Sequence, residues 1–426
     1  MRARPFWRYL AITGLVLGQV IPNVFILFAL PAIFRQQGID LAQIGVLSLA
    51  MFPFWFKWLW APIVDRFGSR RIGLRKSWII PCTTIGALIY ASMTLIPPSA
   101  DTLYLIGGLL VLKNLVMATQ DIAVDAYIVE SLDRGEEATG AAASAIGTTV
   151  GMVVGGSLLV GFYDSLGWEV VMLFAATMLI VGSLTAMLLP ERAPRADLPP
   201  RPAGLSVAFR EIGAHLRSPA SLQVLGLVLI VQFATSLPFR IEGAFLVDKG
   251  LTLTEIGFLG GGATTIGALI GNLLGERLAR WLGLRRALLL SGFAVLIIAA
   301  LYIYVAASPI TAWEYAVINL VSVVLGCPFG VAFNAARYRW CAPARTATDY
   351  TLQSSLNYLA QAAASLGAGQ LASQIGWTGF YIVAGLTMVA ATFALAAVFP
   401  GVTAAVDQRD RSGSDRAASL AAVPAG

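Results

Sequence analysis

Charged side chains are scarce in this chain of 426 residues. Asp, Glu, Lys and Arg together make up 12% of it, about half of the share that is usual in a soluble globular protein. This scarcity excludes a soluble multidomain enzyme. Apolar residues make up 58% of the chain and gather in runs of about twenty, the length that crosses a bilayer as a helix. The composition therefore predicts a membrane protein with many spans.

Histidine and cysteine are also nearly absent. The single histidine, His215, excludes a histidine-ligated metal site and a Ser-His-Asp triad. Cys82, Cys327 and Cys341 lie far apart without CxxC spacing, so they predict neither a disulfide framework nor a metal cluster. We expect no metal, no cofactor, no catalytic residue and no enzyme activity. An integral-membrane acyltransferase, which would have similar hydropathy, needs a catalytic set that one loop histidine does not supply.

Twelve apolar segments are long enough to span a membrane, which predicts an all-α membrane protein of two six-helix bundles. The Pro- and Arg-rich stretch 190–219 is interpreted as a cytoplasmic linker between an N-terminal bundle, 1–189, and a C-terminal bundle, 220–399. The polar segment 400–426 is predicted to be a disordered tail. The expected spans lie near 9–33, 42–64, 78–97, 102–130, 139–163, 167–189, 220–247, 253–276, 286–307, 312–336, 349–373 and 377–399.

Basic residues predict the orientation of the chain. Of the 29 Lys and Arg residues, 24 lie on the side that holds the N-terminus, and only Arg35 and Lys249 lie on the opposite side. Cytoplasmic loops carry the excess of Lys and Arg, so both termini are expected in the cytoplasm. The net charge of +6 follows from these loops, and no nucleic-acid partner is expected. The remaining three, Lys57, Lys113 and Arg240, lie within spans.

The two halves of the chain repeat. Residues 34–47 align without gaps with residues 246–259, at an offset of 212, and both segments join the first and second spans of their half. The alternative is chance similarity between apolar segments, but the matched glycines Gly38 and Gly250 lie in polar loops. Two repeats of six helices in the same orientation are typical of major facilitator transporters, in which substrate binds near the midplane between the halves.

A loop after the second span resembles the signature of that superfamily. Ala61-Pro-Ile-Val-Asp65-Arg66-Phe-Gly68-Ser-Arg70-Arg71 matches Gly-x-x-x-Asp-Arg-x-Gly-x-Arg-Arg, except that Ala61 replaces the first glycine, and a degenerate copy follows Gly275. The resemblance implies a cytoplasmic latch, in which Asp65 accepts hydrogen bonds from a helix N-terminus. A solvated turn is the alternative. The gating residues implied are Asp65, Arg66, Gly68, Arg70, Arg71, Glu276 and Arg277.

Four further segments resemble one branch of the superfamily. They are 57–65, 120–126, 136–156 and 347–355, and the branch includes muropeptide permeases of the AmpG type, acetyl-CoA transporters and ferric-siderophore permeases of the RhtX/FptX type. Muropeptide permeases usually run longer, so the length favours the siderophore permeases. Drug antiporters carry a proline where this chain has Met152. We interpret the glycine row Gly147, Gly151 and Gly155 as a site of close helix packing.

Ionisable residues within apolar spans are costly and are functional candidates. Asp121 and Asp125, four residues apart, share a helix face, and Lys57 is expected at a similar depth. We predict that these three residues and Glu242 couple proton movement to transport. The alternative for Lys57, Asp121 and Asp125 is a structural salt bridge between two helices.

Polar residues within the spans are candidates for binding substrate. Arg240 suits a carboxylate or another oxyanion, with Glu242 as its partner or as a second proton site; snorkelling to the interface is the alternative. The others either bind substrate or hold helices together. The predicted substrate-binding residues are Gln19, Asn23, Lys113, Gln120, Gln232, Arg240, Asn334, Tyr350, Gln353 and Asn357.

These patterns predict a secondary transporter of the bacterial inner membrane. The leading hypothesis is proton-driven uptake of a ferric siderophore. The chain has no ATP-binding P-loop, so an ion gradient is the available energy source. An anhydromuropeptide permease is the alternative, followed by a proton-coupled exporter of drugs or metabolites; a receptor without transport activity is a separate class. The expected partners are the small-molecule substrate, protons and the lipid bilayer, and the protein is expected to be a monomer.

Overall fold

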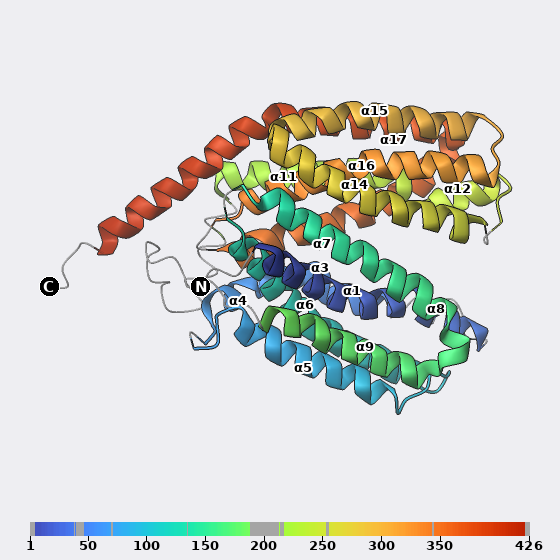
Figure 1. Cartoon of the computed structure of the whole chain (residues 1–426), viewed down its shortest axis with the longest axis horizontal. Coiled ribbons are helices and arrows are strands. Elements are labelled where there is room, and N and C mark those ends of the chain that lie inside the picture. The colour runs from blue at the N-terminus through green and yellow to red at the C-terminus, as the bar shows by residue number, and fades with distance from the viewer. Residues whose placement is uncertain are drawn as a thin grey trace. The chain divides into compact units, whose positions relative to one another are not determined.

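The computed structural model describes residues 5–37, 39, 47–69, 71–133, 135–187, 213, 217–252, 255–342 and 345–421. The chain divides into two compact units. The N-unit comprises Met1–Asp133, Ala143–Ala193 and Arg345–Thr351, and the C-unit comprises Arg134–Ala142, Pro194–Ala344 and Leu352–Gly426. The predicted linker 190–219 and the repeated segment 34–47 lie largely outside the described residues. Every named element is helical (Figure 1).

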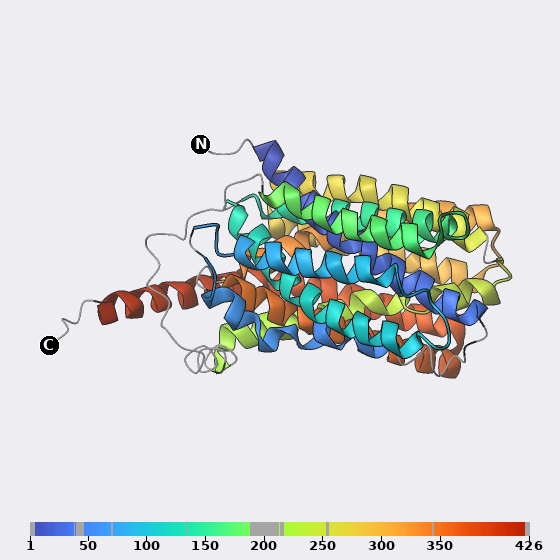
Figure 2. The same ribbon diagram turned by 90° about the horizontal axis from the view of Figure 1, so that it is seen from below.

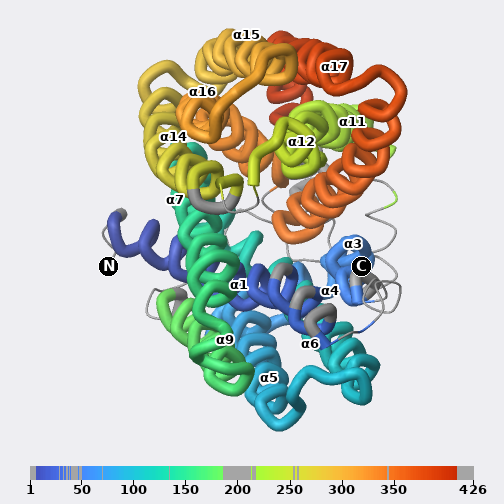
Figure 3. The backbone as a smooth tube through the Cα atoms, turned by 90° about the vertical axis from the view of Figure 1, so that its right-hand side faces the viewer, coloured from blue at the N-terminus to red at the C-terminus, as the bar shows by residue number. Residues whose placement is uncertain are grey.

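Long helices form the N-unit, and α9 packs against both α1 and α5 (Figure 3). Its elements are α1 (Pro5–Gln36), η1 (Leu47–Met51), α3 (Phe52–Phe56), η2 (Lys57–Leu59), α4 (Ala61–Arg66), α5 (Lys76–Met93), α6 (Leu103–Ser131), α7 (Glu137–Met152), η3 (Val153–Leu158), α8 (Leu159–Gly161) and α9 (Tyr163–Met187). The first turns of α7 belong to the C-unit.

The C-unit is built around α16, which packs against α14 and α15. Its elements are α11 (Pro219–Ser236), η4 (Leu237–Phe239), α12 (Glu242–Asp248), η5 (Ile256–Gly260), α14 (Gly261–Leu282), α15 (Leu284–Ala307), α16 (Ala312–Arg339) and α17 (Thr346–Ala421). The first turn of α17 belongs to the N-unit. Each unit has its own apolar core, centred on residues such as Phe25 and Tyr90 in the N-unit and on Phe245 and Phe380 in the C-unit.

Eight helices within the described residues are long and apolar enough to cross a membrane. One of them, Thr346–Arg409, contains the two predicted spans 349–373 and 377–399. Gly376 breaks it with φ 71° and ψ 173°, and Gly167 breaks α9 in the same way. Only glycine adopts such backbone angles without strain. A tryptophan follows each glycine, so both halves turn into their last span through the same Gly-Trp pair.

The second predicted span, 42–64, is not one continuous helix in the residues described. It consists of η1, α3, η2 and α4, and prolines begin both α-helical pieces at Pro53 and Pro62. Proline has no backbone N–H to donate, so it is favoured at the start of a helix and disfavoured within one. The predicted disordered tail also differs from the structure, because α17 continues as helix to Ala421 and extends past the neighbouring helices of the C-unit (Figure 2). The many alanines in this segment favour helix.

The glycine row of α7 and η3 packs against α1. A Cβ atom at Gly147 would lie 2.8 Å from the carbonyl oxygen of Thr13, and one at Gly155 would lie 2.3 Å from that of Ile21. Any larger side chain would separate the helices at these positions. The structure therefore confirms the interpretation of this row as a helix-packing surface.

Candidate functional site

A buried lysine of the N-unit joins two carboxylates of one helix. Lys57 is 0% exposed and lies in the 3-10 turn η2. Its Nζ donates a hydrogen bond to Oδ2 of Asp121 and another, 3.4 Å long, to Oδ2 of Asp125. The structure thus brings these three residues together, and we call them the Lys57 cluster. Their role in proton coupling stays a prediction.

The Lys57 cluster combines a shielded cation with partly accessible anions. The side chains of Asp121 and Asp125 are 22% and 19% exposed, whereas that of Lys57 has no exposed surface. Protonating either carboxylate would weaken the attraction that holds η2 against α6, because a buried ammonium depends on nearby negative charge. The cluster can therefore convert the gain of a proton into a change in the contact between two elements.

Gln19 and Gln120 form a second buried polar group within the N-unit. Nε2 of Gln19 donates to Oε1 of Gln120 at 3.0 Å, and Nε2 of Gln120 donates to the hydroxyls of Thr83 and Ser183. These four residues come from α1, α6, α5 and α9, and all are buried. Gln19 and Gln120, both predicted to bind substrate, thus hydrogen-bond to each other and to neighbouring helices. This agrees with the alternative that such residues hold helices together.

Lys113 and Asn23 also contact each other. Nζ of Lys113 donates to Oδ1 of Asn23 at 2.7 Å and lies 5.6 Å from the ring centroid of Tyr90. Asn23 in turn donates to the backbone carbonyl of Gln19, one helical turn earlier. Lys113 is 2% exposed, so the two predicted residues meet inside the helix bundle of the N-unit.

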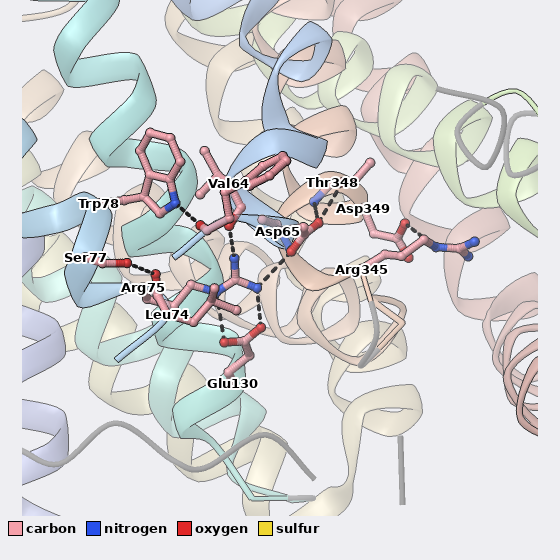
Figure 4. Close-up of polar contacts among 12 residues, drawn as sticks. Val64, Asp65, Leu74, Arg75, Ser77, Trp78, Glu130, Arg345, Thr348 and Asp349 are labelled. Carbon is pink, nitrogen blue, oxygen red and sulfur yellow. Dashed lines mark hydrogen bonds and ion pairs between the residues drawn. The ribbon is translucent and has the colours of Figure 1, made fainter. Parts of the chain in front are cut away.

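Asp65, at the end of α4, accepts hydrogen bonds from the start of α17. The backbone N–H groups of Ala347 and Thr348 donate to its two carboxylate oxygens at 3.2 and 2.8 Å, and the hydroxyl of Thr348 donates at 2.6 Å (Figure 4). The first N–H groups of a helix lack partners within it and favour negative charge. All of these residues belong to the N-unit. The geometry matches that predicted for the latch.

The arginine that supports Asp65 is Arg75. Its Nη2 donates to Asp65 at 2.8 Å and to Glu130 of α6 at 2.5 Å, and its Nη1 donates to the carbonyl of Val64 (Figure 4). Burial lowers the pKa of Arg75, but the charges of Glu130 and Asp65 more than reverse this, so the pKa lies above its ordinary value. Arg75 therefore stays charged at every relevant pH. We call Asp65, Arg75, Glu130 and Thr348 the Asp65 cluster.

The arginines predicted as gating residues differ in their exposure. Arg71 is exposed, and Arg66 is half-buried next to Asp65 in the chain; Arg70 lies outside the described residues. Gly68 is placed as the signature requires, because a Cβ atom there would lie 2.7 Å from the carbonyl oxygen of Leu74. The sequence missed Arg75 because the signature ends at Arg71, although the Arg-Lys pair directly before the next span was a usable signal.

The second half contains a smaller version of this arrangement. Oε1 of Glu276, on α14, accepts a hydrogen bond from the hydroxyl of Thr139 at 2.9 Å and from Nη1 of Arg280 at 3.0 Å. Thr139 lies in the first turn of α7, which belongs to the C-unit. Arg280, which was not predicted, forms the salt bridge to Glu276, and within the described residues no salt bridge involves the predicted gating residue Arg277.

Amide side chains form a connected row in the C-unit. Oδ1 of Asn357 accepts from Nε2 of Gln232 at 2.5 Å and from Nε2 of Gln361 at 2.7 Å, and Oε1 of Gln361 accepts from Nη2 of Arg240 at 2.8 Å. We call Gln232, Asn357 and Gln361 the amide row. Three predicted substrate-binding residues, Gln232, Arg240 and Asn357, thus lie together, joined by Gln361, which was not predicted.

Glu242 does not pair with Arg240 in the structure. Its Oε1 accepts hydrogen bonds from the hydroxyls of Tyr302, at 2.6 Å, and Tyr315, at 3.0 Å. Pairing with Arg240, one of the two roles considered for Glu242, is therefore not seen in this structure, where each side chain is held by a neutral partner. The role of Glu242 as a second proton site stays a prediction. The two tyrosines come from α15 and α16 and could not be linked to Glu242 by sequence spacing.

The other predicted binding residues of the C-unit surround Arg337. Asn334 accepts from Nη1 of Arg337 at 3.2 Å, and Gln353 accepts from its Nε at 3.4 Å. Arg337 is 5% exposed and Gln353 is 1% exposed. Tyr350 is also buried but belongs to the N-unit. Asn334 and Gln353 thus hydrogen-bond to the buried guanidinium of Arg337, a residue that lies just beyond the expected span 312–336.

Known proteins resemble this chain along most of its length. It is 28% identical to the anhydromuropeptide permease of Escherichia coli over 376 residues, which are 86% of this chain and 72% of that protein. It is 24% identical to a Rickettsia conorii protein named transporter AmpG 4 over 395 residues, which are 90% of this chain and 94% of that protein.

Solved structures share the fold. The human organic anion transporter MFSD10 superposes with a TM-score of 0.71 at 16% identity, covering 92% of this chain and all of the other. FucP, in its outward conformation, superposes with a TM-score of 0.69 at 13% identity, covering 92% of this chain and 98% of the other.

The model of the Major Facilitator Superfamily matches residues 12–338. This match covers more than half of the chain, and it agrees with the helical architecture and with the AmpG-like relatives. The predicted all-α transporter fold is thereby confirmed. The chain is a multi-pass membrane transporter that belongs to the AmpG-like branch of the major facilitator superfamily.

Proposed function

We propose that this protein takes up an anhydromuropeptide across the bacterial inner membrane, driven by protons. The observation that carries the substrate class is the similarity to the Escherichia coli anhydromuropeptide permease over 86% of the chain. Such a substrate consists of sugar hydroxyls, amides and carboxylates. Gln232, Asn357 and Gln361, with Arg240 at one end, offer amide donors and acceptors and one guanidinium, which suit these groups.

Ferric-siderophore uptake was the leading hypothesis from the sequence, and it rested on chain length. The alignment with the Rickettsia conorii relative covers 90% of this chain and 94% of that protein, so AmpG-named proteins of similar length exist. Length therefore no longer separates the two substrates. We keep the siderophore, and export of a drug or metabolite, as competing outcomes of the experiment.

We assign proton coupling to the Lys57 cluster. Lys57 contacts both Asp121 and Asp125, and both carboxylates retain some exposure. Both carboxylates contact one ammonium, so a proton that binds to either of them changes the charge balance of the whole cluster. Binding of a proton to this group loosens η2 from α6, and its release restores the contact. This supplies a charge-dependent step without any nucleotide.

Uptake by cells that lack their own muropeptide permease tests the substrate. We expect cells expressing the protein to accumulate labelled N-acetylglucosaminyl-anhydromuramyl tripeptide, and a protonophore to abolish the accumulation. A ferric siderophore should not compete. Accumulation of the siderophore in place of the muropeptide, or labelled muropeptide leaving preloaded cells faster than from control cells, would refute the proposal. Arg339→Gln, which changes an exposed residue at the end of α16, is the control variant.

We also propose that both termini face the cytoplasm. The support is the distribution of basic residues, 24 on one side and two on the other, which follows the positive-inside rule. A single cysteine placed at Asp197, in a variant without the three native cysteines, should resist a membrane-impermeant thiol reagent in intact cells and react after the cells are lysed. Reaction in intact cells would reverse the orientation.

A further inference from the structure

Arg240 and Glu242 are opposite charges two residues apart, yet neither meets an opposite charge. Arg240 donates to the neutral amide of Gln361, and Glu242 accepts from the hydroxyls of Tyr302 and Tyr315. Within the part of the chain that the structure describes, no salt bridge involves either residue. An apolar span thus presents one uncompensated cation and one uncompensated anion side by side in the sequence.

The backbone places the two charges on adjoining elements. Pro238 lies in the 3-10 turn η4, and Arg240 caps that turn. Ile241, with φ −123° and ψ 17°, leaves the helical region, and Glu242 then begins α12. In a continuous helix, side chains two residues apart point to different faces, whereas Pro238 interrupts the helix here because it lacks a backbone N–H to donate. The break therefore fixes two opposite charges on adjoining elements.

Neutral partners orient each charge and leave part of it available. Both tyrosine hydroxyls donate to Oε1 of Glu242, and Oε2 accepts no hydrogen bond within the described residues. Only Nη2 of Arg240 is engaged, although a guanidinium offers five N–H donors. Unpaired charges in a span are costly and mark sites for ligands or ions.

Aromatic rings pack against one of the tyrosines that hold the carboxylate. The ring of Tyr302, which donates to Glu242, stacks on Tyr381 at 5.4 Å between centroids and meets Phe239 edge to face at 5.6 Å. An ammonium group is attracted both by a carboxylate and by the faces of aromatic rings. The guanidinium of Arg240, in contrast, suits a carboxylate, which it can bind through two parallel hydrogen bonds.

We propose that Arg240 and Glu242 together bind an amino-acid head group, an ammonium and a carboxylate carried on one carbon. Glu242 takes the ammonium and Arg240 takes the carboxylate, while Gln361 and the two tyrosines hold the side chains in place. The inference rests on the proposed function, because a muropeptide carries a peptide. The free end of a diaminopimelate residue in such a peptide has an ammonium and a carboxylate on one carbon. Glu242 then serves in substrate recognition, and the Lys57 cluster alone carries the proton.

A matched set of probes and variants tests the site. The probes are the anhydromuramyl tripeptide that ends in diaminopimelate, the same molecule acetylated on its free amine, and the same molecule amidated on the adjoining carboxyl. The variants are Glu242→Gln, which can still accept from both tyrosines, and Arg240→Gln. Glu169→Gln and Arg339→Gln change exposed charges elsewhere and are the controls. Competition for uptake gives the apparent affinity of each probe.

We expect acetylation to weaken binding to the unaltered protein about tenfold or more and to have no further effect in Glu242→Gln. Amidation of the carboxyl should likewise weaken binding to the unaltered protein about tenfold or more and have no further effect in Arg240→Gln. Equal losses on acetylation in Glu242→Gln and in the unaltered protein would overturn the assignment of the ammonium. So would a Glu242→Gln variant that loses its dependence on the pH gradient but still discriminates against the acetylated probe, because Glu242 would then be a proton site.

A binding measurement separates this inference from the proposed function. Free diaminopimelate should raise the melting temperature of the purified protein, and Glu242→Gln should remove that shift while the control variants keep it. If the protein transports the tripeptide but shows no shift and no discrimination, the head-group site is refuted and the proposed function stands. If it shows the shift but transports no muropeptide, the site stands and the proposed substrate is wrong.

Discussion

The carboxylate of Asp65 accepts hydrogen bonds from both the backbone N–H and the hydroxyl of Thr348, 283 residues further along the chain. The same carboxylate is bound by Arg75, which also binds Glu130. A negative charge at the end of one helix thus holds the first turn of another, and a buried guanidinium fixes that charge in place. This contact joins segments that come from opposite halves of the sequence.

Replacing Asp65 by Asn should slow transport while the protein stays folded. Asn can still accept hydrogen bonds, but it removes the charge that strengthens them and that balances Arg75. A hydrogen bond to a charged group contributes about 1.5–3 kcal/mol, so we expect uptake to fall about tenfold. Thr348→Val, which removes only the hydroxyl, should have a smaller effect. Wild-type uptake by Asp65→Asn at normal expression would show that Asp65 is only a loop carboxylate.

Replacing Gly68 by Ala should reduce the stability of the folded protein. The added Cβ would lie 2.6 Å from Cδ1 and 2.7 Å from the carbonyl oxygen of Leu74, and 2.7 Å from Oγ of Ser77. Overpacking of this kind costs about 1–3 kcal/mol. The melting temperature of the purified protein measures the loss. Gly108→Ala is the matched control, because a Cβ there meets nothing within 4 Å; equal melting temperatures for the two variants would contradict the crowding at Gly68.

Changes to the Lys57 cluster distinguish coupling from structure. Lys57→Met alone should reduce the yield of folded protein, because removing one partner of a buried ion pair costs about 3–5 kcal/mol. Adding Asp121→Asn should recover the fold but not uptake driven by a pH gradient, while exchange of substrate at equal pH persists. Fluorescence-detected size exclusion measures the first effect and vesicle uptake the second. Recovery of gradient-driven uptake in the double variant would leave only a structural role.

Gln120 and Gln232 should respond differently to the same substitution. Gln120→Leu removes the acceptor of Gln19 and one hydrogen-bond partner each of Thr83 and Ser183, whose hydroxyls keep the bond to each other. A buried polar group left unsatisfied costs about 1–3 kcal/mol. We expect a lower melting temperature with an unchanged KM for uptake. Gln232→Leu removes one end of the amide row and should raise KM with less loss of stability. A raised KM in Gln120→Leu together with a lower melting temperature in Gln232→Leu would show that Gln120 binds substrate and Gln232 holds helices together.

Spacing along a helix made the Lys57 cluster predictable. Asp121 and Asp125 are four residues apart, so they lie on one face of a helix. A buried lysine in an apolar span has few other partners. The long helices were predictable for a similar reason, since a run of about twenty apolar residues has few other stable conformations in a bilayer.

Contacts that depend on the path of a loop or on the direction of a side chain were not predictable. Arg75 reaches Asp65 because the loop after Gly68 folds back, and no periodicity encodes that fold. Gln19 and Gln120 contact each other inside the N-unit, although their spans could equally have turned them outward. Pairing with Arg240 was one of the two roles considered for Glu242, and no spacing in the sequence indicates that two tyrosines from distant spans hold its carboxylate instead.

The composition of the two units has a consequence for how the protein is made. Arg345–Thr351 belongs to the N-unit although it follows most of the C-unit in the sequence, and Arg134–Ala142 belongs to the C-unit although it precedes the linker. Two polypeptides produced by splitting the gene within the linker would each lack a short piece of their own unit. Such fragments should be degraded when expressed singly and recover by complementation when expressed together, so synthesis of the first half cannot complete its folding until the eleventh span has emerged from the ribosome.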